Sequence, residues 1–249
     1  MEQAAQVALA NRILHDRGIV DAFGHPSVRS ADGQGFLISR NLAPASVTPA
    51  DVQRMNLDAT TDDPRPAYLE RFIHAAIYRA RPDVGAVIHH HSPAVLPFSV
   101  SSRRLVPVTH MAGFLGDGAP VFEIRDVVGS ESDLMIGSNE LAAALAGVLG
   151  DSAVVLMRGH GATVVGATIE QAVHRAVYTE YNARALASAV ALGGQPTCLT
   201  RAEAEAADLA TSTQAHRAWS YWSAQVHDDL AETGELQWPP SVSEATAPR

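Results

Sequence analysis

The stretch Val84-Gly85-Ala86-Val87-Ile88-His89-His90-His91 joins an apolar run to three consecutive histidines. A short apolar run of this kind predicts a buried β-strand. Successive side chains of a strand point to opposite faces, so His89 and His91 share one face and His90 lies on the other. Two imidazoles on one face form half of a transition-metal site. On an exposed strand the pair would be only polar surface, but the apolar run favours a buried strand end.

His160 is the candidate for a third imidazole. It lies in Met157-Arg158-Gly159-His160-Gly161, between two further apolar runs at residues 153–156 and 162–166. These runs predict two strands joined by a short turn. The glycines on either side of the histidine allow the backbone to approach its neighbours closely. We therefore take His160 as the third candidate metal ligand.

Glu70 is the candidate carboxylate of the same site. Residues 67–81 predict a helix that ends before Pro82. Glu70 and His74 are four residues apart on this helix, and we expect them to share a face. Three imidazoles and one carboxylate with open coordination positions describe a catalytic metal site better than a structural one.

The composition of the 249 residues excludes several classes of function. The net charge is −9 and the arginines are scattered, so we expect no nucleic-acid partner. No apolar stretch reaches the roughly 20 residues that span a bilayer, and the acidic start Met1-Glu2-Gln3 is unlike a secretory signal. We therefore expect a cytoplasmic protein with no membrane contact. The single cysteine, Cys198, excludes an intramolecular disulfide, and the absence of lysine excludes Schiff-base chemistry.

The remaining patterns predict one domain of mixed strands and helices over residues 1–238, followed by a disordered tail at 239–249. A β-hairpin is predicted at 23–40, and short strands around a glycine-rich loop at 105–126. Thr48-Pro49 predicts the start of a helix. Further helices are predicted at residues 2–17, 138–149, 168–192 and 200–230.

Two blocks of the sequence resemble the class II aldolase/adducin family. The first runs from Glu70 through residues 74–93, and the second covers residues 155–166, in the order and spacing of that family. The resemblance implies an α/β fold, a single-domain α/β/α sandwich whose central mixed, mostly antiparallel sheet carries helices on both faces. It also implies a homo-oligomer, with a tetramer favoured and the site near a subunit interface.

The same resemblance implies roles for the candidate site residues. His89, His91 and His160 would bind a divalent metal, with Zn²⁺ expected first and Mn²⁺, Co²⁺ or Fe²⁺ as alternatives. Glu70 would be the acid–base carboxylate, which can also occupy the metal when substrate is absent. His110 falls where family members often place a catalytic aromatic or acid–base residue, and its alternative is a core or loop histidine.

The sequence departs from the sugar-phosphate aldolases of this family where they bind phosphate. Their Gly-Asn-x-Ser segment reads Gly24-His25-Pro26-Ser27 here, and their serine pair before the glutamate reads Tyr68-Leu69. Arg40 could bind a carboxylate at two points, or be only a surface arginine. We expect His25, Arg40 and Tyr68 to bind a small-molecule carboxylate without phosphate, and an aromatic acid fits Tyr68.

These features predict a metal-dependent carbon–carbon lyase that acts on a small hydroxy- or oxo-carboxylate. Decarboxylation, for example of a dihydroxy aromatic acid, and retro-aldol cleavage both fit, because each leaves electron density on oxygens that a metal stabilises. The alternatives are a sugar-type aldolase or epimerase of the same family, or a non-catalytic adducin-like scaffold. The retained carboxylate and histidines argue against the scaffold.

Overall fold

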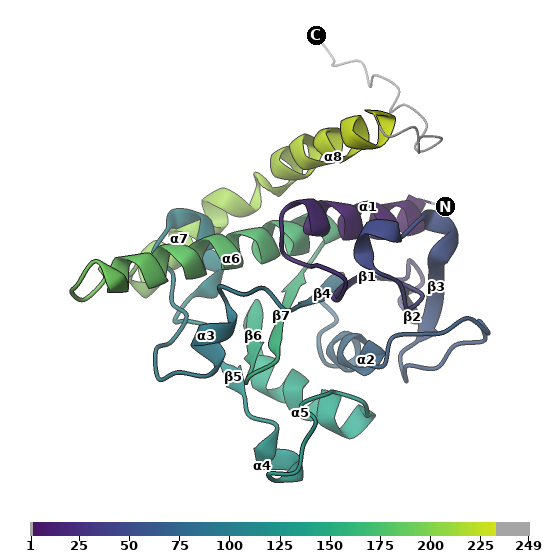
Figure 1. The fold of residues 1–249 in the computed structure, drawn as a ribbon, viewed down its shortest axis with the longest axis horizontal. Helices are drawn as coiled ribbons and strands as arrows, with labels where there is room; N and C mark the ends of the chain where they lie inside the picture. The colour runs from purple at the N-terminus through teal and green to yellow at the C-terminus, as the bar shows by residue number, and fades with distance from the viewer. Residues whose placement is uncertain (1, 233–249) are drawn as a thin grey trace.

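Residues 2–232 are described in the computed structural model, and they form one β-sheet flanked by helices (Figure 1). The sheet has seven strands in the order β3-β2-β1-β4-β7-β6-β5. Neighbouring strands are antiparallel except for β5 and β6, which are parallel. The strands are β1 (His25–Arg29), β2 (Gly35–Ser39), β3 (Val52–Asn56), β4 (Ala86–His90), β5 (Val121–Phe122), β6 (Val154–Met157) and β7 (Gly161–Gly166).

Helices cover both faces of this sheet (Figure 1). Helices α1, α6 and α8 share one apolar core with side chains of β4, β6 and β7, and helices α2 and α5 share a second core with the opposite faces of the same strands. These layers confirm the predicted α/β/α sandwich. The helices are α1 (Glu2–Asp16), α2 (Arg71–Ala80), α3 (Leu96–Ser99), α4 (Arg125–Val128), α5 (Asn139–Leu149), α6 (Ile169–Ala191), α7 (Arg201–Ser212) and α8 (Ala215–Glu232), with 3-10 helices η1 (Pro44–Ser46), η2 (Pro49–Asp51) and η3 (His110–Leu115).

Strand β4 lies at the centre of the sheet and carries the first histidines of the triplet. Ala86 and Ile88 point into the core beneath α1 and α6, whereas Val87 points into the core beneath α2. The alternation continues into the histidines, because His89 faces the start of α2 and His90 lies on the α6 side. The predicted division of the triplet between the two faces is confirmed.

The hairpin of β1 and β2 and the helices α1, α5 and α6 confirm their predictions to within a few residues. The helix predicted at 200–230 is instead two helices, α7 and α8. The hydroxyls of Thr211 and Thr213 donate to the carbonyls of Ala207 and Ala210, at 2.8 and 3.0 Å. Hydroxyl bonds of this kind compete with the helical backbone ladder and favour a break.

One other local prediction is wrong, and one is confirmed in a shorter form. Of the strands predicted at 105–126, only β5 forms, and the 3-10 helix η3 occupies part of that range. A Cβ on Gly113 would lie 2.4 Å from the carbonyl oxygen of Ala204, so the missing side chain lets η3 pack directly on α7. The helix start predicted at Thr48-Pro49 is confirmed, with Thr48 as the N-cap and Pro49 as the first residue, but the helix is the single 3-10 turn η2, which leads at once into β3.

Between residues 2 and 232, no helix is long and apolar enough to cross a membrane. The end of the predicted domain at residue 238 and the predicted tail at 239–249 lie outside the described residues.

Candidate metal centre

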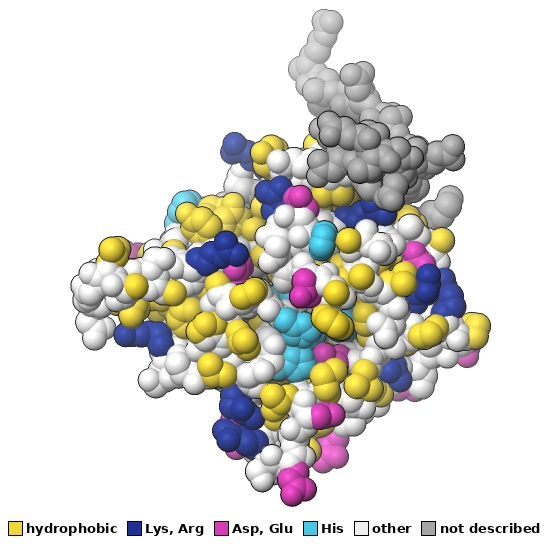
Figure 2. Space-filling model, viewed as in Figure 1, with side chains coloured by type: hydrophobic (Ala, Val, Ile, Leu, Met, Phe, Trp, Pro, Cys, Tyr) yellow, Lys and Arg dark blue, Asp and Glu magenta, His cyan; other side chains and the backbone are white. Residues whose placement is uncertain are grey.

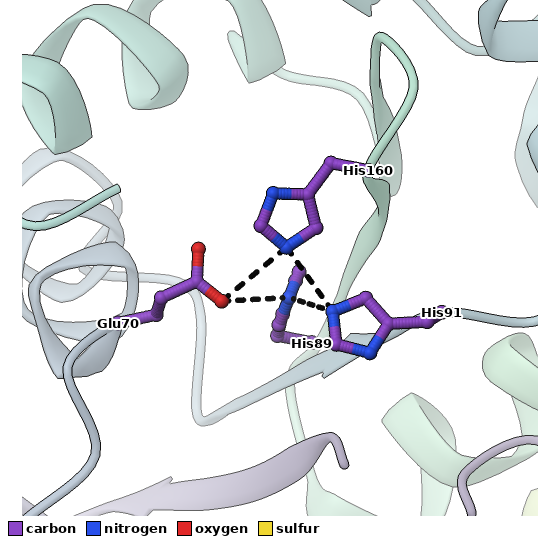
Figure 3. Close-up of side chains that lie close together, drawn as sticks. All are labelled: Glu70, His89, His91 and His160. Atoms are coloured by element: carbon purple, nitrogen blue, oxygen red, sulfur yellow. Dashed lines mark hydrogen bonds and ion pairs between the residues drawn. The ribbon is translucent and has the colours of Figure 1, made fainter. Parts of the chain in front are cut away.

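Four side chains from distant parts of the chain converge beside the end of β4 (Figure 3). Nε2 of His91 lies 3.0 Å from Nε2 of His89 and 3.1 Å from Nε2 of His160. The Oε2 atom of Glu70 lies 3.2 Å from Nε2 of His89 and 3.4 Å from Nε2 of His160. The structure therefore brings together all four residues that the sequence proposed as a metal site.

The spacing of these four atoms suits a small divalent cation. Zinc binds imidazole nitrogens at about 2.0–2.1 Å in tetrahedral sites, which places neighbouring ligand atoms about 3.3 Å apart. The separations between the ligand atoms here are 3.0, 3.1, 3.2 and 3.4 Å. Imidazole nitrogens with one carboxylate oxygen are also a donor set that several transition metals accept. The residues present fit a bound divalent metal.

Hydrogen bonds behind the rings orient the ligand nitrogens. Nδ1 of His160 donates to the carbonyl oxygen of Leu134 at 2.7 Å, which leaves the lone pair on Nε2 for a metal. Nδ1 of His89 lies 3.4 Å from the hydroxyl oxygen of Thr163 on the neighbouring strand β7. The turn that carries His160 contains Gly159 at a φ of 66°, a conformation that glycine adopts without strain.

Glu70 lies at the N-cap of α2 and not within the helix. The predicted position of Glu70 within the helix is therefore wrong, and α2 begins one residue after it. The helix begins at Arg71, whose guanidinium donates to the carbonyl of Tyr68 and holds the preceding residues in a turn. Oε1 of Glu70 accepts a hydrogen bond from the backbone N–H of Ile136 at 3.1 Å, so Oε2 is the oxygen that faces the histidines. A helix N-terminus favours negative charge, which suits an ionised carboxylate.

Burial and neighbouring groups set the protonation of the site. Burial alone would raise the pKa of Glu70, but His89 and His160 lower it well below its ordinary range. Burial would lower the pKa of His160, whereas the hydrogen bond and charge of Glu70 raise it. Burial, followed by the neighbouring histidines, lowers the pKa of His91 to about 4. Glu70 is therefore ionised and His91 neutral near pH 7, and these are the states that bind metals.

The metal centre opens into a cavity of about 550 Å³. The rings of His25 and Tyr68 line it as well, with centroids 4.4 Å apart. The hydroxyl of Tyr68 donates to the carbonyl oxygen of Leu42 at 2.6 Å, so the ring is the part left for a ligand. Figure 2, drawn in the same view as Figure 1, shows histidine side chains near the middle of the visible surface, bordered by hydrophobic side chains. Apolar residues of the lining are Ala22, Phe23, Leu42, Ala43, Leu69 and Met135.

The chain also matches known proteins. The model of the Class II Aldolase and Adducin N-terminal domain family matches residues 5–187. The chain belongs to this family. The predicted family resemblance is thereby confirmed, and the family model covers every residue of the metal centre.

Curated relatives of this class II aldolase/adducin chain include decarboxylases. Decarboxylase tropJ of Talaromyces stipitatus is 37% identical, and the alignment covers 90% of this chain and 92% of the relative. The 3,4-dihydroxyphthalate decarboxylase of Arthrobacter keyseri is 29% identical, with 88% and 92% covered. Both relatives support the prediction of a lyase.

Among solved structures, the L-fuculose 1-phosphate aldolase from Glaciozyma antarctica superposes with a TM-score of 0.75 at 22% identity. The superposition covers 93% of this chain and 90% of the aldolase. This likeness confirms the class II aldolase fold.

Two predicted site residues of this family member lie apart from the metal centre. Nε of Arg40 lies 2.8 Å from a carboxylate oxygen of Asp51, so the guanidinium is already paired and does not line the cavity. His110 is exposed on η3 and lines a second cavity of about 630 Å³ together with His174. Within one chain, neither Arg40 nor His110 joins the metal ligands.

The sequence did not single out three polar residues that lie behind His25. These are Ser27, His74 and Tyr78, which hydrogen-bond in series. One signal was present, because Glu70, His74 and Tyr78 recur every four residues along a segment that is otherwise largely apolar. Ser27 stands two residues after His25, which places both on one face of a strand.

Proposed function

We propose that this protein is a divalent-metal-dependent decarboxylase of a small, non-phosphorylated hydroxy- or oxo-carboxylate. The observation that carries the proposal is the convergence of Glu70 with three imidazoles at the wall of a cavity. The names of two relatives support decarboxylation, and one of them supports a dihydroxy aromatic acid as the substrate class. Retro-aldol cleavage and epimerisation are the alternatives that the same residues could serve.

The proposed metal is Zn²⁺, held by His89, His91 and His160, with Mn²⁺, Co²⁺ and Fe²⁺ as alternatives. A divalent metal bound there would act as a Lewis acid toward adjacent substrate oxygens and stabilise the negative charge left by carbon–carbon cleavage. The protein would hold these imidazoles aligned toward the metal. The complete burial of His89 and the hydrogen bond from His160 to Leu134 serve that purpose.

Glu70 is the residue to which we assign proton transfer. In a decarboxylation, the carbon that loses carbon dioxide must gain a proton. Glu70, which is ionised in the free protein, would first accept a proton from a hydroxyl group of the substrate and then deliver that proton to the carbon. The two oxygens of Glu70 have separate tasks, because Oε1 accepts from the backbone of Ile136 while Oε2 faces the histidines. The anchored oxygen holds the carboxylate in place as the other exchanges a proton.

The cavity wall favours a flat acid with an apolar body over a sugar phosphate. Tyr68 and Leu69 stand where the sugar-phosphate aldolases carry a pair of hydroxyl donors, and both line the cavity. An aromatic ring can stack on Tyr68, and Met135 offers a further apolar contact. His25 is a polar group of the same wall and is placed to bind a substrate oxygen.

The proposed assembly is a homo-oligomer, with a tetramer favoured and the cavity near a subunit boundary. Phe23 and Leu69 line the cavity and remain 67% and 50% exposed. Exposed apolar side chains that cluster beside a site are typical of surfaces that another chain covers. In such an assembly, His110 of a neighbouring subunit can take the acid–base role that it does not reach within its own chain.

The test is an assay of purified protein loaded separately with each candidate metal. The acid substrate is 3,4-dihydroxyphthalate, and the competing substrate is L-fuculose 1-phosphate. Release of carbon dioxide from the acid supports the proposal, whereas release of an aldehyde from the sugar phosphate supports the aldolase alternative. Chelator-treated protein is the control. If metal-loaded protein turns over no acid in a panel of hydroxy- and oxo-carboxylates, the decarboxylase proposal is wrong.

A further inference from the structure

Four hydrogen-bonded side chains form a series that runs from the cavity wall into the core. Nδ1 of His25 lies 2.7 Å from Nε2 of His74, and Nδ1 of His74 lies 2.6 Å from the hydroxyl oxygen of Ser27. That hydroxyl lies 2.8 Å from the phenol oxygen of Tyr78. Of the four, only His25 lines the cavity. The series therefore connects a residue of the site to polar groups that no ligand reaches.

The inner members of this series are shielded from water. The exposed fractions are 0% for Ser27, 0% for His74 and 1% for Tyr78. The exposed fraction of His25 is 4%. Burial and then His89 lower the pKa of His74 to about 3. Both rings of the series are buried from water and neither forms an ion pair among the described residues, so each ring is neutral and carries one N–H.

A buried hydrogen-bond donor that lacks an acceptor destabilises the fold. This rule indicates in which direction the four side chains donate their protons. If the donors point toward the core, His25 donates to His74 and His74 to Ser27. Ser27 then donates to Tyr78, whose own O–H has no acceptor among residues 2–232. This direction leaves a buried phenol unsatisfied.

The opposite direction satisfies every inner donor. Tyr78 donates to Ser27, and Ser27 donates to Nδ1 of His74. The Nε2–H of His74 then donates to Nδ1 of His25. The one N–H that remains is on Nε2 of His25, a nitrogen that hydrogen-bonds no described residue and belongs to a ring that lines the cavity.

We propose that Tyr78, Ser27 and His74 fix the tautomer of His25, so that it presents an Nε2–H donor to the cavity. Such a donor recognises an oxygen acceptor, which in a carboxylate substrate is a carboxylate or carbonyl oxygen. The choice of a carboxylate as the ligand rests on the proposed function, whereas the direction of donation rests on the contacts alone. Tyr78, Ser27 and His74 are positioning residues, because they act only through His25.

The proposed tautomer also keeps His25 from binding the metal, although His25 lies beside the candidate metal ligand His89. Strands β1 and β4 pair with His25 opposite His89, and the two ring centroids are 5.3 Å apart. A free lone pair on Nε2 of His25 would offer a further imidazole to the metal. A proton on that nitrogen removes the lone pair, so the ligand set stays at Glu70 and three histidines.

The direct test is the nitrogen-15 spectrum of histidine-labelled protein loaded with Zn²⁺ near neutral pH. The signals of His25 are assigned by their loss in His25→Gln. We expect a protonated Nε2 and an unprotonated Nδ1, and a protonated Nδ1 on His25 would overturn the proposal. This measurement uses the wild-type protein and needs no substrate, so its outcome is separate from the success of the proposed function.

Two variants of similar size probe the role of His74. His74→Gln keeps an N–H donor beside His25, whereas His74→Met removes it. We expect Gln to retain the tautomer and Met to lose it, with 3,4-dihydroxybenzoate binding about ten- to hundredfold more weakly to the Met variant. Catechol, which lacks the carboxylate, should bind all three proteins alike.

The two probes also separate this inference from the proposed function. Unchanged binding of the acid to folded, zinc-loaded His74→Met protein would overturn the inference. If neither probe binds the wild-type protein, the dihydroxy aromatic acid is wrong as the substrate class of the proposed function, and the tautomer spectrum still decides the inference.

Discussion

The backbone of Gly161 stands so close to His90 that a Cβ on the glycine would lie 2.3 Å from the carbonyl oxygen of His90. This contact joins β7 to β4 where His160 and His91 leave the sheet, since Ala162 pairs with His90. Because the backbones of β7 and β4 are in such close contact, His160 and His91 stay near enough to each other to bind the same ion. Any side chain at residue 161 must therefore displace one strand or the other.

The substitution Gly161→Ala should lower both the free energy of unfolding and the affinity for metal. Overpacking of this kind costs about 1–3 kcal/mol. The matched control is Gly147→Ala in α5, where the added Cβ would meet no atom within 4 Å beyond its chain neighbours and the backbone of its own helix. That control should stabilise the protein by about 0.5–1 kcal/mol, because alanine favours helix. Urea unfolding measures both, and a Gly161→Ala protein as stable as wild type would contradict the steric argument.

Removal of one imidazole should strip the metal. His89→Ala and His160→Ala each delete a ligand nitrogen, so we expect the affinity for Zn²⁺ to fall by more than about 100-fold, the upper effect of losing an outer-shell partner. Elemental analysis after dialysis measures the bound metal. His216→Ala is the control, because the side chain of His216 is 77% exposed and is not one of the four grouped donors. Full metal content in the His160→Ala protein would show that His160 is not a metal ligand.

Glu70→Gln should separate chemistry from metal binding. The amide keeps the shape of the side chain and an oxygen that accepts from Ile136, so the protein should fold and bind metal through its histidines. Turnover should fall by about 10²–10⁴-fold if the carboxylate transfers the proton. The measurement is kcat and bound metal in the same sample, for the wild-type protein and for Glu70→Gln. A Gln variant that keeps full turnover would exclude Glu70 as the acid–base group.

Acid should destabilise the fold through buried neutral histidines. The pKa of His74 is lowered by burial and then by His89, from 6.5 to about 3. The unfolded chain therefore binds this proton more readily, so the stabilisation is complete above pH 6.5 and is lost as the pH falls toward about 3. The free energy of unfolding should fall by up to about 1.4 kcal/mol per pH unit for this one group.

The variant His74→Gln isolates that contribution. Its free energy of unfolding, measured by urea titration at several pH values, should fall less steeply than that of wild type over the same range. Buried histidines that His74 does not influence titrate alike in both proteins and cancel in the comparison, whereas His25, whose pKa is lowered by burial and then by His74, adds to the difference in the same direction. Identical slopes would show that His74 is not held neutral in the folded state.

If the active site is formed by residues of two subunits, two inactive variants should complement each other when their subunits are mixed. If His110 of one subunit serves the cavity of its neighbour, His110→Ala and Glu70→Gln oligomers are each inactive. Subunits exchanged between the two should then regain on the order of a quarter of wild-type turnover, because some boundaries pair two intact halves. Mixing without subunit exchange is the control. A mixture that stays inactive after verified exchange would contradict sharing of the site between subunits, and a His110→Ala oligomer that keeps full turnover by itself would place His110 outside the site.

The metal centre could be predicted because its ligands follow local patterns. Period-two alternation places His89 and His91 on one face, and the glycines around His160 indicate a turn between two strands. The central strand and the hairpin follow from the same kind of pattern. These features depend on residues adjacent in sequence, so the chain alone reveals them.

The remaining features depend on contacts between distant segments. Glu70 stands before its helix because Arg71 holds the carbonyl of Tyr68, which no periodicity indicates. The bond between His25 and His74 joins residues 49 positions apart. The break between α7 and α8 arises from hydroxyl bonds to the backbone, at residues that a helix otherwise tolerates.

The antiparallel pairing of β1 with β4 also limits how this scaffold can diversify. His25 and His89 stand directly opposite each other, so the spacing between them is the interstrand distance, which varies little among sheets. A new specificity cannot arise by moving one toward the other. It must come from exchanges in the connecting segments near Leu42 and Met135, which border the cavity without belonging to any strand.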